Sequence, residues 1–139
     1  MVTLSFAEQS AWMQPMRPKT ARIEFVFSNG DKRHPLIELL AHLDSVRTIG
    51  VGPGNGYYER ARPTVVKRSY AYDRAIIRAI ESLGCFFPEA VNKKQWTELG
   101  DVDVIFLDKR GKMLGATVTH ESMIITPDDE DKDRQPRLS

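Results

Sequence analysis

The fold is decided by residues 102–119, VDVIFLDKRGKMLGATVT. The run 102–107 is apolar apart from Asp103, residues 108–111 have the composition of a turn, and 113–119 are largely apolar again. Two such runs joined by a short turn predict an antiparallel hairpin. Residues 123–126 follow closely enough to form another strand, so this part of the chain predicts a β-meander.

A further strand and a helix are predicted upstream of the hairpin. From Arg22 the apolar side chains alternate, and the pair Asn29-Gly30 favours a turn after them. Pro35 suits the first position of a helix. Leucines follow it at helical spacing: Leu36, Leu39, Leu40 and Leu43. We therefore expect a half-buried strand, with Ile23, Phe25 and Phe27 on one face, and then a helix that ends between Asp44 and Arg47.

The middle of the chain predicts a loop, a short strand and two helices. Glycine dominates residues 46–56, which we expect to form a loop, whereas 64–69 could form a short strand. Ser69 suits a helix cap and Gly84 suits the end of that helix. Between them runs an apolar stripe: Tyr72, Ile76, Ile77, Ile80 and Leu83. Pro88 is placed to start another short helix that would continue to Leu99.

This order of elements indicates the fold class. Helices grouped ahead of consecutive strands are typical of α+β proteins, so we predict an antiparallel or mixed sheet with two to three helices on one face. We expect an irregular N-terminal arm at 1–20, a single globular domain at 21–126 and a charged tail at 127–139. The tail is almost devoid of apolar residues, which predicts disorder.

Composition narrows the classes of function. With 139 residues, of which 41% are hydrophobic and 28% charged, the chain can bury one core. A single cysteine excludes an internal disulfide, and no apolar run approaches the ~20 residues that cross a bilayer. We expect a cytoplasmic protein without membrane association. The net charge of +1 disfavours a dedicated duplex-binding domain, while basic 57–80 and acidic 98–108 suit a protein partner.

A run of glycines invites comparison with phosphate-binding loops. It lacks the Gly-Lys-Ser/Thr ending of a Walker loop, because Tyr57-Tyr58 follows, and it lacks the spacing of a dinucleotide fingerprint. We expect a mobile surface loop, which either only connects its neighbours or binds a partner. No cofactor is predicted. The loop residues are Gly50, Gly52, Gly54, Asn55 and Gly56.

All four tyrosines lie between Tyr57 and Tyr72, in the most basic stretch of the chain. Tyrosine and arginine often anchor protein interfaces, because each combines a large contact area with a polar end. Single-stranded nucleic acid stacked on the tyrosines is an alternative, and so is an ordinary strand and helix without a binding role. The predicted partner-binding residues are Tyr57, Tyr58, Arg60, Arg62, Lys67, Arg68, Tyr70, Arg74 and Arg78.

Catalytic and metal-binding groups have little support in the sequence. Cys85 has aromatic neighbours, where a thiol usually serves as a small buried hydrophobe. Asp101 and Asp103 alternate on the predicted strand, and we expect both to face solvent. No metal site and no catalytic residue is therefore predicted. The histidines do not have the spacing of metal ligands: His34, His42 and His120.

The sequence favours a small non-catalytic protein-binding module that uses residues 50–78. Small bacterial proteins that inhibit an enzyme or neutralise a toxin, such as immunity proteins, often combine a compact α+β domain with charge patches of both signs. A nucleic-acid-binding protein that uses the same segment is the alternative. An enzyme that uses Cys85 or the pair Asp101 and Asp103 is the third hypothesis.

Overall fold

The computed structural model describes residues 4–28, 30, 32–54, 65–87 and 97–127. The helices in this part of the chain are α1 (Phe6–Met13), α2 (Pro35–Ala41) and α3 (Arg74–Ser82), with short 3-10 helices η1 (Arg17–Lys19) and η2 (Thr119–Glu121). The strands are β1 (Arg22–Phe27), β2 (Thr48–Pro53), β3 (Val66–Ala71), β4 (Val102–Leu107), β5 (Met113–Val118) and β6 (Met123–Ile125). None of these described helices combines the length and the apolar character that a membrane span requires.

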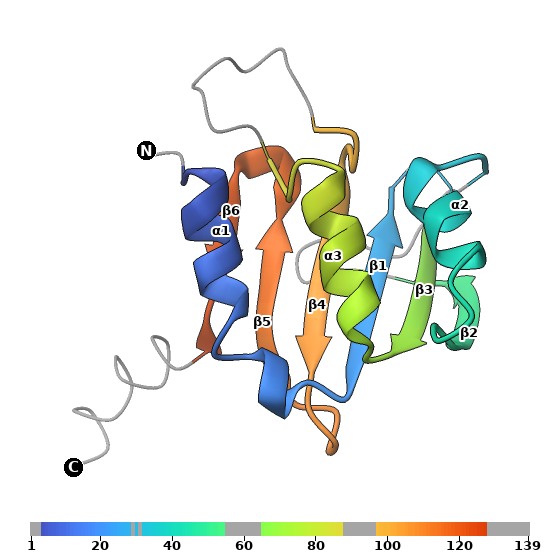
Figure 1. The fold of residues 1–139 in the computed structure, drawn as a ribbon, viewed down its shortest axis with the longest axis horizontal. Helices are drawn as coiled ribbons and strands as arrows, with labels where there is room; N and C mark the ends of the chain where they lie inside the picture. The colour runs from blue at the N-terminus through green and yellow to red at the C-terminus, as the bar shows by residue number, and fades with distance from the viewer. Residues whose placement is uncertain (1–3, 29, 31, 55–64, 88–96, 128–139) are drawn as a thin grey trace.

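The strands form one six-stranded sheet in the order β2-β3-β1-β4-β5-β6, and every neighbouring pair is antiparallel. The α-helices all lie on the same face of this sheet (Figure 1). The predicted α+β class, with helices on one sheet face, is therefore confirmed. The predicted meander is also confirmed, since β4, β5 and β6 are consecutive neighbours.

The main core lies between the helices and the sheet. Phe25 and its cross-strand partner Val104 are both fully buried, and the neighbouring pair Ile23 and Phe106 is too. Helix α3 adds the buried Ile76 and Ile80. The prediction that Ile23, Phe25 and Phe27 share one face is confirmed, because all three belong to this core cluster. The strand is not half-buried as predicted, since Glu24 and Val26 on its other face are buried as well.

The opposite sheet face carries a second, smaller apolar cluster over its centre. Its buried members are Val26, Val65, Ile105, Leu107 and Ala116. Next to this cluster Glu24 is buried and paired with Lys67, whose ammonium nitrogen lies 3.4 Å from the carboxylate. We call this side of the sheet the helix-free face, and it is apolar toward β4 and β5 but charged and polar toward β3.

Helix α1 differs from the irregular arm that we predicted. A capping box starts it, in which the Ser5 hydroxyl accepts the Glu8 N–H and the Glu8 carboxylate accepts the Ser5 N–H. The hydrogen bond from the Ser5 backbone lowers the pKa of Glu8. Further along α1, Gln9 is fully buried and hydrogen-bonds the main chain at Phe86 and Phe87. Helix α1 thus contributes Gln9 and Met13 to the packed interior.

Two predictions for the middle of the chain are wrong. Residues 48–53 form the strand β2 and not a loop, because their main chain pairs with β3. Ser69 lies within β3, where its hydroxyl donates to Glu24, and Asp73 caps α3 by accepting the N–H of Ala75. Most of the predicted helix from Pro88 and of the predicted tail lies outside the described residues. Within 97–99 the chain forms a turn at Glu98 and Leu99.

Candidate functional site

The predicted partner-binding residues that the structure describes do not share one surface. The structure describes five of them: Lys67, Arg68, Tyr70, Arg74 and Arg78. The other four lie outside the described residues, as do Asn55 and Gly56 of the predicted loop; these four are Tyr57, Tyr58, Arg60 and Arg62. Arg74 and Arg78 are exposed on α3. In Figure 1, α2 lies between α3 and the end of the sheet formed by β2, so these arginines are separated from the glycine-rich strand.

Tyr70 is a core residue. Its side chain is 2% exposed, and its ring packs against Phe25 in a T-shaped contact with centroids 5.8 Å apart. Cross-strand pairing with Ile23 explains this position, because both side chains point toward the helices. Tyr70, one of the three tyrosines predicted to bind a partner, thus packs the protein interior and does not belong to the surface of β2 and β3.

Strand β2 forms one edge of the sheet and exposes apolar side chains there. Ile49 is 55% exposed and Val51 is 53% exposed; with Leu39 of α2 they are the exposed large hydrophobic residues of the described chain. Among the described residues β2 pairs with β3 alone. An edge strand leaves main-chain N–H and C=O groups on its outer side that can pair with another chain.

The surroundings of this edge are basic. Arg47 directly precedes β2 and is exposed, with its carbonyl accepting the N–H of Ala71 at 3.0 Å. Lys67 and Arg68 lie on β3 opposite Gly52 and Val51. Neither strand contains an acidic residue, but the Lys67 ammonium is paired with the Glu24 carboxylate of β1. We define the β2 edge surface as Arg47, residues 48–53, Lys67 and Arg68.

Gly50 and Gly52 have no structural need to be glycine. Neither has a positive φ, and a Cβ atom added at either position would meet no atom within 4 Å. Gly54 differs, because a Cβ atom there would lie 2.5 Å from the Cβ of Lys67. Glycine within a strand costs about 0.5–1 kcal/mol relative to alanine and often marks a place where another molecule approaches. The pair at Gly50 and Gly52 therefore fits a contact outside this chain.

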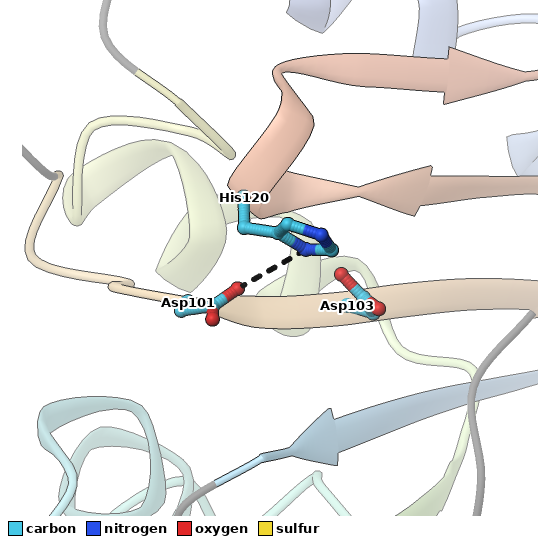
Figure 2. Close-up of side chains that lie close together, drawn as sticks. All are labelled: Asp101, Asp103 and His120. Carbon is cyan, nitrogen blue, oxygen red and sulfur yellow. Dashed lines mark ion pairs between the residues drawn. The ribbon is translucent and has the colours of Figure 1, made fainter. Parts of the chain in front are cut away.

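A second candidate site is a group of three potential metal ligands, which lies where β4 begins and where η2 follows β5. Asp101, Asp103 and His120 each offer an oxygen or nitrogen atom, and these atoms all lie within 4.8 Å of one another. Figure 2 shows the imidazole of His120 facing both carboxylates, with Nδ1 4.0 Å from Asp101 Oδ1. Asp101 and His120 are partly exposed, with side-chain exposures of 37% and 47%. Imidazole and carboxylate together are suitable ligands for Zn²⁺ and other transition metals.

Asp103 is held rigidly within this group. We expected it to face solvent, and this is wrong, because it is only 4% exposed and its carboxylate accepts the N–H of Thr119 at 2.9 Å. The Thr119 hydroxyl donates to the carbonyl of Val102 at 2.6 Å and lies 3.0 Å from the Thr117 hydroxyl. These bonds fix the start of η2, from which His120 projects.

The sequence analysis did not group His120 with Asp101 and Asp103, because His120 lies far from the two aspartates along the chain. The hairpin carries a usable signal, however. Its register pairs Ile105 with Ala116, and the same register extended toward the strand ends places Asp101 opposite His120. The register shifts by one residue between Phe106 and Leu107, so a search for ligand types at matched hairpin positions would have found this pair only if it allowed such a shift.

The other candidate groups have structural roles. Cys85 is buried, and its sulfur lies 3.7 Å from the Ser10 hydroxyl. His34 caps α2, since its Nδ1 accepts the N–H of Leu36, and its Nε2 lies 2.8 Å from the Leu99 carbonyl. Both ring nitrogens of His34 thus contact main-chain groups.

Comparison with protein-family models, with curated proteins and with solved structures gave no match for this chain. Among the residues that the structure describes, the β2 edge surface and the aspartate–histidine group are the candidate functional sites.

Proposed function

We propose that the chain is a small non-catalytic protein-binding module that contacts its partner through the β2 edge surface. The observation that carries this proposal is the exposure of Ile49 and Val51 on an edge strand. Soluble proteins usually protect such edges with charges, with short strands or with a covering element. An edge of six residues with apolar side chains in solvent fits a site that a partner covers.

A protein partner fits this surface better than nucleic acid does. Stacking platforms for single strands need exposed aromatic rings, and Tyr70, the aromatic residue of the described strands β2 and β3, is buried in the core. The basic groups at the edge are accompanied by aliphatic side chains, and apolar groups next to arginine are typical of protein interfaces. Cytoplasmic inhibitors and immunity proteins that neutralise a toxin belong to this class, and we propose the chain as one of them.

A charge placed on β2 tests the proposal. Val51→Glu should reduce capture of the partner from a native extract by about tenfold or more, because a desolvated carboxylate replaces an apolar contact. Ala7→Glu serves as the matched control, because Ala7 is exposed on α1 and this helix lies far from β2 across the sheet (Figure 1). Quantitative mass spectrometry of proteins retained by the full chain measures the effect.

The result that would refute this function is equal retention of the same proteins by wild type and by Val51→Glu. Retention of single-stranded nucleic acid that falls steeply with added salt would favour the alternative class. Circular dichroism of both variants checks that the fold is intact, as expected for an exposed position.

A second function, binding of a divalent metal ion, is favoured by the convergence of Asp101, Asp103 and His120. Zn²⁺ accepts imidazole nitrogen and carboxylate oxygen, and three protein ligands leave a further position open. In this role Thr119 orients Asp103, as outer-shell hydrogen bonds commonly do for metal ligands.

Metal binding should appear as added thermal stability. At a free Zn²⁺ concentration of ~100 times the Kd, the folded chain should gain about 2.7 kcal/mol, and His120→Ala should remove most of this gain. His42→Ala is the matched control, because His42 is exposed at the end of α2. Differential scanning calorimetry with and without Zn²⁺ measures the shift, and an equal shift in both variants would exclude this site.

A further inference from the structure

We propose that His34 is a pH-sensitive switch, whose neutral form holds the start of α2 against the turn before β4 and whose protonation releases that start. His34 is the residue that precedes α2, and its ring is half-buried. This residue belongs to neither candidate site, so the switch goes beyond the functions proposed above and does not depend on them.

The two ring nitrogens of His34 require one form of the imidazole. Nδ1 accepts the N–H of Leu36 at 3.1 Å, so this nitrogen carries no proton. Nε2 lies 2.8 Å from the carbonyl oxygen of Leu99, which can only accept, so Nε2 carries the proton. A protonated ring has an N–H group at both nitrogens, and its Nδ1 would then face another donor. Protonation of His34 therefore breaks the hydrogen bond that caps α2.

The ring of His34 connects two parts of the chain that are distant in sequence. On one side it caps α2 at Leu36, whose side chain is fully buried in the core. On the other side it contacts the turn at Leu99, which is also fully buried, and a Cβ atom added at Gly100 would lie 3.8 Å from Nε2. A T-shaped contact with Phe27, with centroids 5.0 Å apart, holds the ring between these two sides.

Charged groups near His34 set the pH at which the ring takes up its proton. Positive neighbours oppose protonation and carboxylates favour it. None of them returns an acceptor to Nδ1 once that nitrogen is protonated, so they do not change the consequence for α2. The described groups lie in the preceding turn, in the first turn of α2 and beside the turn at Leu99, whereas Asp31 lies outside the described residues: Lys32, Arg33, Glu38, Glu98 and Asp101.

The packing of α2 should therefore weaken as the pH falls. With α2 in place His34 is neutral, whereas with its start released the ring is an ordinary imidazole, which protonates at about pH 6.5. The released state thus binds more protons, and acid shifts the equilibrium toward it. Release would reach both candidate sites, because residues 42–47 connect α2 directly to β2 and because Leu99 lies close to Asp101 in the chain.

NMR spectroscopy of the full chain tests the switch. At about pH 7.5 the nitrogen shifts of the His34 ring should be those of the neutral form with its proton on Nε2. Histidine is the side chain that titrates between about pH 7.5 and about pH 5.5. Over this range the hydrogen-exchange protection of the α2 amides, corrected for the intrinsic exchange rate, should fall by about fivefold, as expected for the loss of a helix cap.

Substitution of each histidine assigns the effect. Asparagine caps helices well but does not titrate, so His34→Asn should give the same protection of α2 at both pH values. The chain has two other histidines, both exposed, and His42→Asn and His120→Asn are the matched controls that should keep the change with pH. Each variant is compared with itself at the two pH values, so a uniform loss of stability in His34→Asn does not imitate the expected result.

Two kinds of result would overturn the switch. One is a His34 ring that carries a proton on Nδ1 when the medium is at about pH 7.5. The other is a pH dependence of α2 that persists in His34→Asn, or that disappears in His42→Asn or His120→Asn and so belongs to another ring. These measurements involve neither partner capture nor added metal, so their outcome is separate from that of the proposed functions.

Discussion

Replacement of Gln9 by leucine should lower the free energy of unfolding by about 3 kcal/mol, because it leaves several buried main-chain groups without hydrogen bonds. The Gln9 amide donates to the carbonyls of Leu4 and Phe87, and its carbonyl oxygen accepts the N–H of Phe86 at 2.9 Å and that of Phe87 at 3.4 Å. Urea unfolding of the full chain measures the change.

The cause of this dependence lies at the end of α3. Gly84 and Cys85 both have positive φ, at 91° and 60°, and turn the chain sharply after the helix. The rings of Phe86 and Phe87 enter the core there and are fully buried, which places their amides beside α1. The side chain of Gln9 thus connects α1 to the segment that follows α3 by hydrogen-bonding the main-chain groups of Phe86 and Phe87.

Gln14 provides a matched control at the end of the same helix. It is exposed, and its side chain accepts one exposed hydrogen bond from Arg17. Gln14→Leu should change the free energy of unfolding by no more than about 0.5 kcal/mol. If Gln9→Leu proved equally mild, the buried amide would not connect α1 to the core as we infer.

Replacement of Gly115 by alanine should destabilise the protein by about 2 kcal/mol through overpacking. A Cβ atom at this position would lie 2.5 Å from the sulfur of Met16 and 2.8 Å from Cζ2 of Trp12. Met16 can shift its flexible end. Trp12 is fixed by T-shaped contacts with Phe86 and Phe106 and by a hydrogen bond from its Nε1 to the Thr126 hydroxyl at 3.1 Å.

Thermal unfolding measures the loss of stability, and tryptophan fluorescence reports the displacement of the Trp12 ring. Gly50→Ala is the control, since its added methyl group meets no atom within 4 Å and its backbone has no positive φ. It should leave the stability unchanged or raise it by up to about 1 kcal/mol. Equal stability of Gly115→Ala and Gly50→Ala would contradict the close contact between α1 and β5.

Much of the fold could be predicted from short-range patterns. Ile23, Phe25 and Phe27 alternate because a strand turns every second side chain toward the same face, here the one that the helices cover. The apolar residues of α3 follow the helical period because one side of this helix packs against the core, where Ile76, Ile77 and Ile80 are all buried. The hairpin of β4 and β5 was visible from its turn, where the Asp108 carboxylate accepts the N–H groups of Arg110 and Lys112.

The candidate sites were less predictable, because they depend on contacts between distant segments. β2 is rich in glycine and has no strand pattern of its own, yet it forms a strand since β3 offers main-chain partners. Arginine and tyrosine content indicated residues 57–78 as one surface, but the register of β3 turns Tyr70 into the core. Composition cannot reveal which face of a strand a residue occupies.

The sequence by itself determined the α+β class, the central strand β1, the helix α3 and the meander, because side-chain periodicity is a local property of each element. Only the tertiary structure decided that β2 becomes an exposed edge, that Gln9 is buried against Phe86 and Phe87, and that His120 meets Asp101 and Asp103. These features follow from strand order and register, which are set by the packing of the whole chain rather than by any one segment.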